Sequence, residues 1–152
     1  MTPLEERLGI ENQILIRDGF SQFQVYRSPD GASYYLWGDH KTNSGNIYTI
    51  WGQISNYYPN VRPQIYIYNP NSLKGYGGLK TINSYGISHY MHTLTNGPNG
   101  EVQICHWRDD RWHSAITLNK VMIKVVLWLE AYEQHLATGR SISEFVRTMS
   151  ST

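Results

Sequence analysis

Four short runs of strand-forming residues, separated by turn signals, constrain this chain more than any other feature. The runs cover residues 23–27, 33–39, 46–54 and 64–68. Pro29-Asp30-Gly31 and residues 43–46 are turn sequences, so neighbouring runs should pair as antiparallel hairpins. In the third run apolar residues occupy both alternating faces, which is typical of a central strand. The pattern predicts a four-stranded antiparallel meander.

A helix should precede the strands, over residues 2–18. Thr2 is a suitable N-cap, and Pro3 suits the first helical position. A narrow stripe of residues at helical spacing supports this prediction, although Gly9 weakens the helix and Gly19 should end it. The members of the stripe are Leu4, Leu8, Glu11, Leu15 and Asp18.

A longer amphipathic helix should follow Thr117, which is a plausible cap, and end at Gly139. Its apolar face has three- and four-residue spacing and comprises Leu118, Met122, Val125, Val126, Leu129, Tyr132 and Leu136. A short last helix is expected from about Ser143, followed by a frayed Ser/Thr-rich tail.

The length and composition of the chain point to one soluble domain over residues 1–152, with no linker and no internal repeat. One cysteine excludes an internal disulfide and fits a reducing cytoplasm. Thirteen Lys+Arg balance twelve Asp+Glu, so there is no basic footprint for nucleic acid or an anionic membrane. No apolar run is long enough to span a bilayer, and no phosphate-binding loop is found. We expect no cofactor, no nucleic acid and no membrane partner.

The chemistry should centre on Cys105. A polar Asn99-Gly100 turn precedes it, a charged loop over residues 108–111 follows it, and Trp112 leads toward the long helix. A lone cysteine is often a small core hydrophobe, but these neighbours favour a thiol that reaches solvent. The thiolate is the nucleophile in acyl transfer, and nearby cations would raise its population.

Two other chemistries use the same residue types. A cysteine hydrolase would pair Cys105 with His89, His92, His106 or His113, oriented by Asn96, Asn99 or Asp110, but no local protease signature is present. A zinc site would draw on His89, His92, Cys105 and His106, but the chain lacks a second cysteine pair, so we expect no metal. His40 and His135 are most simply solvated.

Three segments resemble ubiquitin-conjugating enzymes. They are Asn99-Gly100 leading to Ile104-Cys105 with Trp112 seven residues later, the Tyr58-Pro59…Pro63 crossing, and Trp128-Leu129…Tyr132-Glu133…Thr138-Gly139. The last pattern is similar to the bacterial branch of the family found in CBASS antiphage operons. The resemblance implies an α/β (α+β) fold with an N-terminal helix, a four-stranded antiparallel meander, an active-site loop and a central helix.

The resemblance also implies roles for residues. Cys105 would carry a thioester, and His92 would stand for the histidine of the family's His-Pro-Asn triplet, whose proline and asparagine are missing here. The oxyanion donor would then be Asn96, Asn99 or a backbone N–H, and Trp112 would anchor the entrance to the helix.

The conjugated partner in that branch is the C-terminus of a cGAS-like nucleotidyltransferase, which is joined to an amine. Because this chain contains no nucleotide-binding fingerprint, the need for a separate activating enzyme stays open. The rival functions are a catalytically silent binding module of the same fold and a cysteine hydrolase.

Overall fold

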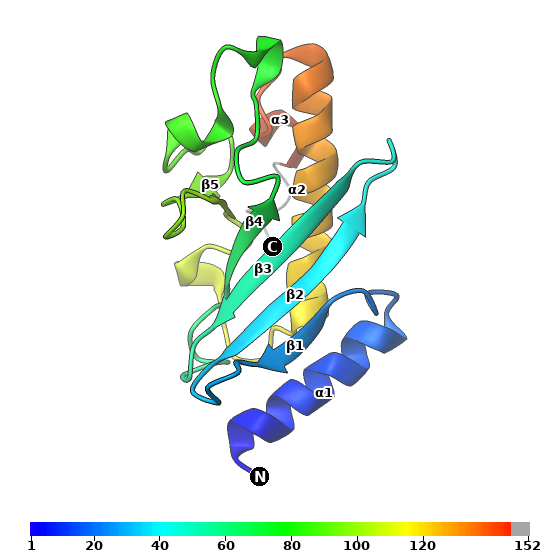
Figure 1. Ribbon diagram of the computed structural model, residues 1–152, viewed down its shortest axis with the longest axis vertical. Coiled ribbons are helices and arrows are strands. Elements are labelled where there is room, and N and C mark those ends of the chain that lie inside the picture. Colours follow the sequence, from blue (N-terminus) through cyan, green and yellow to red (C-terminus); the bar gives the residue numbers. More distant parts are fainter. Residues whose placement is uncertain (147–152) are drawn as a thin grey trace.

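The computed structural model describes residues 1–146; the predicted frayed tail lies outside this range. The chain forms a mixed structure of helices and one antiparallel sheet (Figure 1). Its helices are α1 (Pro3–Arg17), α2 (Leu118–Thr138) and α3 (Ser143–Val146), with 3-10 turns at Tyr76–Gly78, Ile82–Tyr85 and Asp109–Arg111. Its strands are β1 (Gln24–Arg27), β2 (Tyr34–Lys41), β3 (Ile47–Ile54), β4 (Gln64–Asn69), β5 (Thr93–Leu94) and β6 (Val102–Ile104).

The first four strands form the predicted meander, but the sheet has six strands, in the order β1-β2-β3-β4-β6-β5. The prediction of four strands was therefore wrong. The two additional strands have only two and three residues, too few to show an alternating pattern in the sequence. β6 forms because the apolar residues Ile65 and Ile67 of β4 pair with Ile104 and Val102.

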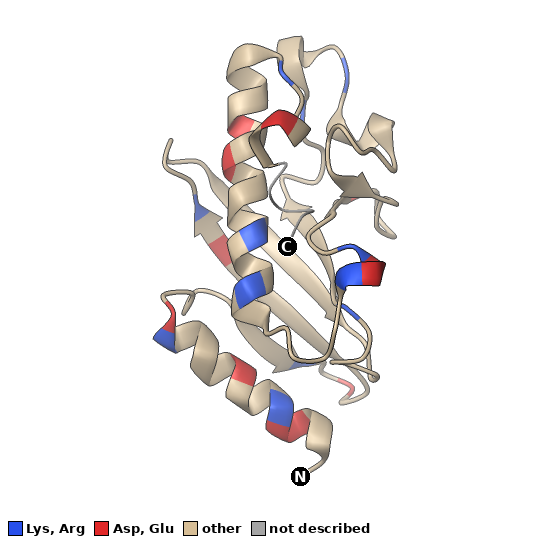
Figure 2. Ribbon diagram, turned by 180° about the vertical axis from the view of Figure 1, so that it is seen from behind, with Lys and Arg blue, Asp and Glu red and all other residues tan. Residues whose placement is uncertain are grey.

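Helix α2 covers one face of the sheet, and none of the three described helices lies on the other face (Figures 1 and 2). The covered face and the helix share one apolar core, in which Ile50, Ile67 and Ile104 pack with Met122 and Leu129. Five of the seven residues predicted for the apolar face of α2 are buried: Leu118, Met122, Val125, Leu129 and Tyr132. Val126 is only partly buried and Leu136 is 38% exposed, so neither belongs to the core. Gly139 ends the helix in the left-handed conformation, as predicted.

Helix α1 lies at the β1 end of the sheet and contacts both β1 and α2 (Figure 1). Thr2 caps it by accepting a hydrogen bond from the Glu5 N–H (3.1 Å), as predicted. The Asn12 side chain extends the β1 edge, since its amide donates to Val25 O (3.1 Å) and its oxygen accepts from the Val25 N–H (2.7 Å). Edge strand β1 is thus partly covered by a side chain.

The turn between β2 and β3 is tied to α2 through the Glu133 carboxylate. Its Oε2 accepts hydrogen bonds from Thr42 (3.0 Å), Asn46 (2.7 Å) and Tyr48 (3.0 Å). Partial burial acts to raise the pKa of Glu133, but these hydrogen bonds outweigh it and the pKa is lowered. Within residues 1–146, no helix combines the length and the apolar character that crossing a membrane requires.

Candidate active site around Cys105

Cys105 directly follows β6 and continues its pairing with β5. Its backbone N–H donates to the carbonyl oxygen of His92 (2.9 Å), one residue before β5. The preceding residue, Ile104, is fully buried in the core, whereas Cys105 is half-buried with a free thiol. The sheet therefore fixes the backbone of Cys105 and leaves its side chain at the border between core and solvent.

The thiol lies in a mixed electrostatic environment. Burial raises the pKa of Cys105, whereas the charges of Arg62, Arg108 and Lys124 act to lower that pKa and Asp109 acts to raise it. The net pKa shift is upward, so the expectation of an enriched thiolate is not met in this state. The cations are nevertheless in place to stabilise a thiolate as it forms.

Arg62 connects the crossing before β4 to the loop after the cysteine. Its guanidinium donates to the carbonyl oxygen of Trp107 and pairs with the Asp109 carboxylate at 2.8 Å. The neighbouring Arg108 pairs with Asp110 at 2.7 Å, but both side chains are exposed. The Arg62 contacts hold the charged loop beside the sheet, whereas an exposed pair such as Arg108–Asp110 adds little stability.

Lys124 brings a third positive charge to the site, from α2. Its ammonium lies over the ring of Trp107, 3.4 Å from the ring centroid. The residue is buried, and burial lowers the pKa of Lys124 to about 8, an effect that the charge of Cys105 opposes. Sequence reasoning missed this residue. The available signal was a charged residue three positions after Val121 and four before Trp128, two residues that are themselves buried.

His92 is buried beside the cysteine and has an unusual backbone. It is the one described non-glycine residue with a positive φ, +51°. Burial lowers the pKa of His92, as does the nearby His89, whose ring centroid is 5.6 Å away. The His92 Nε2 has no hydrogen-bond partner within residues 1–146. His92 therefore shapes the segment that pairs with Cys105, while its lowered pKa favours the neutral form of the ring.

His106, the residue directly after the cysteine, is also buried. Its Nε2 contacts the carbonyl oxygen of Pro63 at 2.7 Å, so that nitrogen must carry the proton. Burial lowers the pKa of His106 to about 3, which keeps the ring neutral at physiological pH. His106 thus links the loop to the Tyr58–Pro63 crossing and acts as a structural residue.

Asn96 and Asn99, which the sequence suggests as oxyanion donors, form their hydrogen bonds away from the thiol. The Asn96 amide donates to Asn83 O (2.9 Å), and the exposed Asn99 accepts from Asn71 through its backbone oxygen (3.3 Å). Neither side chain bonds Cys105 within the described chain. In contrast, the indole N–H of Trp107 is buried with no partner among those residues, and sequence reasoning did not single it out.

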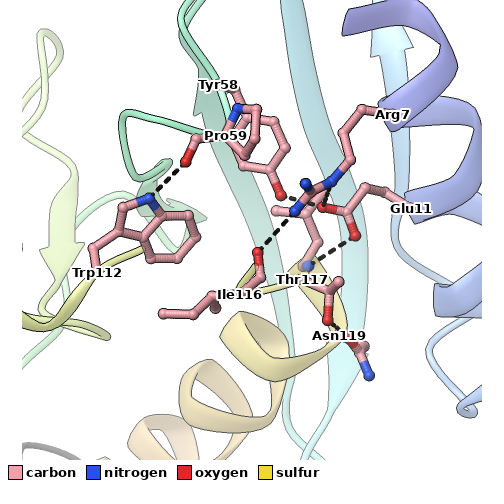
Figure 3. A network of polar contacts seen from close by, with 9 residues as sticks. Arg7, Glu11, Tyr58, Pro59, Trp112, Ile116, Thr117 and Asn119 are labelled. Carbon is pink, nitrogen blue, oxygen red and sulfur yellow. Dashed lines mark hydrogen bonds and ion pairs between the residues drawn. The ribbon is translucent and has the colours of Figure 1, made fainter. Parts of the chain in front are cut away.

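Trp112 lies where the sequence predicts, at the entrance to α2. Its indole N–H donates to the carbonyl oxygen of Pro59 (2.9 Å), and its ring packs against the core (Figure 3). Tyr58, the residue before Pro59, donates its hydroxyl to the buried Glu11 carboxylate (Figure 3). Hydrogen bonds therefore join the Tyr58–Pro63 crossing to the approach to α2 and to α1.

The remaining histidines do not assemble a hydrolase. His89 and His113 are exposed, and no imidazole is hydrogen-bonded to Cys105 Sγ in the part of the chain that the structure describes. The expectation that His135 is solvated was wrong: it is buried, and its Nε2 accepts from the Tyr76 N–H (3.1 Å). No group of three or more His, Cys, Asp or Glu side chains within residues 1–146 is placed to hold a metal ion.

Comparison of the chain with models of known protein families found no match, and searches of curated proteins and of solved structures found none either.

Proposed function

We propose that this protein is an acyl carrier of the ubiquitin-conjugating type, as in bacterial CBASS defence, with Cys105 as its nucleophile. The observation that carries the proposal is the placement of Cys105. A half-buried thiol, fixed through its backbone to His92, lies among the three cations Arg62, Arg108 and Lys124. The order of a helix, a meander, the cysteine and a long helix adds support.

The first step forms a thioester. The Cys105 thiolate attacks the carbonyl carbon of an activated protein C-terminus, supplied as an acyl-adenylate or as the thioester of an activating enzyme. The new C–S bond forms as the bond to AMP or to the donor sulfur breaks, and the leaving group takes the electron pair. Arg62, Arg108 and Lys124 stabilise the thiolate before the attack.

The second step passes the acyl group to an amine. The amine nitrogen attacks the thioester carbon, a C–N bond forms, the C–S bond breaks, and Cys105 leaves as a thiolate while the amine loses one proton to solvent. The developing oxyanion needs a hydrogen-bond donor. Asn96 already donates to Asn83, whereas the buried indole N–H of Trp107, two residues after Cys105, has no partner within residues 1–146. We assign this N–H as the side-chain donor, and it would have to turn toward the thioester to act.

A polar hollow beside the site suits an extended protein tail. It has a volume of about 450 Å³ and is lined by Gln53, Ser55, Val61, Arg62, Gln64 and Asp109. Two of these residues, Arg62 and Asp109, also act electrostatically on the thiol. Side-chain amides and a guanidinium can hydrogen-bond a peptide backbone and its carbonyl groups. This lining favours the C-terminus of a partner, such as a cGAS-like nucleotidyltransferase, over an apolar small substrate.

Intact mass spectrometry tests the proposal. The protein is incubated with the nucleotidyltransferase, an activating enzyme and ATP, and the adduct is then treated with a thiol reductant. A labile adduct should form on the native chain, a more stable oxyester on Cys105→Ser, and none on Cys105→Ala. An adduct on Cys105→Ala, or the absence of a reductant-sensitive adduct on the native chain, would refute Cys105 as the nucleophile.

One observation favours a second candidate, a binding module without catalysis. Burial raises the pKa of Cys105, and no imidazole of the described chain is hydrogen-bonded to its sulfur. A thiol that stays unmodified by iodoacetamide in the folded protein, at a pH where an unfolded control reacts, would favour this module. Hydrolysis of a model thioester without any amine would instead favour the hydrolase.

A further inference from the structure

The sheet face opposite α2 carries a row of aromatic side chains. Trp37 of β2 is paired with Trp51 of β3, which is paired with Tyr66 of β4. The rings of Trp51 and Tyr66 stack with centroids 4.9 Å apart, and Trp37 lies 4.8 Å from Tyr68. These residues alternate with core residues along their strands, so they point away from α2. No helix of residues 1–146 covers this face (Figure 1).

Two adjoining hollows lie on this face. The larger, about 520 Å³, is lined by Tyr26, Tyr35, Trp37, Trp51, Tyr68, Asn99 and Glu101. The second, about 380 Å³, shares Trp37, Tyr68, Asn99 and Glu101 with it and adds Thr49, Asn69 and Asn71. Because they share four lining residues, the two hollows form one continuous groove, with aromatic side chains on one side and amides on the other.

The charge of the groove is one-sided. Glu101 lies where the two ends meet and is only 1% exposed. One of its oxygens, Oε1, accepts from the Asn99 N–H at 2.7 Å, and it forms no ion pair within residues 1–146. No Lys or Arg of residues 1–146 lines either hollow. A carboxylate that is withdrawn from water without a cation is costly, and a cation entering the groove would offset that cost.

We propose that this groove binds an arginine side chain on an extended segment of a protein partner. A guanidinium is planar and weakly hydrated, so it can stack on the rings of Trp37 and Trp51 while it pairs with Glu101. The side chains of Asn69, Asn71 and Thr49 can then hydrogen-bond the flanking peptide backbone. A small molecule usually binds in a more enclosed cavity than this open surface groove. None of the residues that line the two hollows acts on Cys105, so the inference stands apart from the proposed function.

Titration by nuclear magnetic resonance tests the inference. The probe is the blocked peptide acetyl-Gly-Gly-Arg-Gly-Gly-amide, and the matched peptide carries citrulline, which has nearly the same shape without the charge. The indole N–H signals of Trp37 and Trp51 should shift saturably with the arginine peptide. The citrulline peptide should bind about tenfold more weakly or worse, the loss expected of one good charge–aromatic contact.

Two variants give the test its control. Glu101→Gln keeps an acceptor for the Asn99 N–H but removes the charge, so it should weaken arginine binding about tenfold. Tyr57→Ala removes an exposed aromatic ring outside the groove and should leave binding unchanged. Equal binding of both peptides would overturn the proposal. So would arginine binding that Glu101→Gln leaves unchanged, or no shift up to about 10 mM arginine peptide.

Discussion

The carboxylate of Glu11, in the N-terminal helix, accepts a hydrogen bond from the backbone N–H of Leu118, the first residue of α2 (3.1 Å). The sequence suggests Thr117 as the cap of α2, but that prediction holds only for the backbone. The Thr117 hydroxyl contacts Asn119, and it makes no capping hydrogen bond. A residue 107 positions earlier thus accepts the hydrogen bond of the first backbone N–H of the helix.

Replacing Glu11 with alanine should destabilise the fold by about 3 kcal/mol, because Leu118 N–H, the Tyr58 hydroxyl and Arg7 would all lose a buried acceptor (Figure 3). Urea unfolding measures this as a lower midpoint with an unchanged slope. Glu6→Ala is the control, since Glu6 is exposed in the same helix and should change stability by less than about 0.5 kcal/mol. Equal losses in the two variants would contradict the capping role.

Glu11 also illustrates how far the sequence can lead. Its helical spacing with Leu8 and Leu15 placed it on the buried stripe, and the structure confirms that position. The partners of Glu11 could not be predicted, because Tyr58 and Leu118 are distant from it in the sequence. They become neighbours of Glu11 only in the folded chain. Periodicity reports which face is buried and carries no information about contacts distant in sequence.

Two glycines should respond to alanine in opposite directions. Gly9 lies in α1 with open space around its Cα, so Gly9→Ala should stabilise the protein by about 0.5–1 kcal/mol through helix propensity. At Gly38, an added methyl would collide with the backbone oxygen of Gln22 and reach within 2.7 Å of the Phe23 ring. Gly38→Ala should therefore lower the thermal midpoint while Gly9→Ala raises it. A neutral Gly38→Ala would show that the β2 backbone gives way easily.

The free energy of unfolding should decrease as the pH is lowered below about 6.5, because His106 is buried as a neutral ring. Its pKa is about 3 in the folded protein and about 6.5 when unfolded. Between these values the unfolded state binds more protons, so acid favours unfolding by about 1.4 kcal/mol per pH unit. The stabilisation is complete above the unfolded pKa and is lost as the pH falls toward 3.

His106→Gln checks this assignment, since its amide can still donate to Pro63 O but cannot titrate. Urea midpoints measured from pH 7 to pH 4 should fall less steeply for this variant than for the native chain. Part of the slope should remain, because burial also lowers the pKa of His92. An unchanged slope would assign the acid sensitivity to other groups.

The site was predictable in part. The segment around Cys105 predicted a thiol that reaches solvent, and the structure leaves that thiol half-buried. The position of Trp112 before the long helix predicted an anchor, which the structure places against Pro59. The electrostatics could not be predicted, because the degree of burial that raises the thiol pKa depends on packing. Lys124 escaped notice for a related reason: a lysine within a helix normally faces solvent, and only the packed helix shows it turned toward Trp107.

Lys124 should control the reactivity of the thiol. Its charge lowers the pKa of Cys105, so Lys124→Met should raise that pKa and slow alkylation by iodoacetamide several-fold at pH 7. The difference from the native chain should narrow above about pH 8, where Lys124 loses its own proton and the two groups titrate together.

Lys120→Met is the matched control, because it removes the same charge from an exposed position of the same helix. Iodoacetamide reacts with the thiolate, so its rate constant from pH 6 to pH 9 follows the ionisation of Cys105 directly. The native rate should still be rising at pH 9, since burial holds the thiol pKa above its ordinary value. If Lys124→Met and Lys120→Met reacted alike at pH 7, long-range charge would explain the effect, and the position of Lys124 beside Trp107 and the thiol would have no special role in the site.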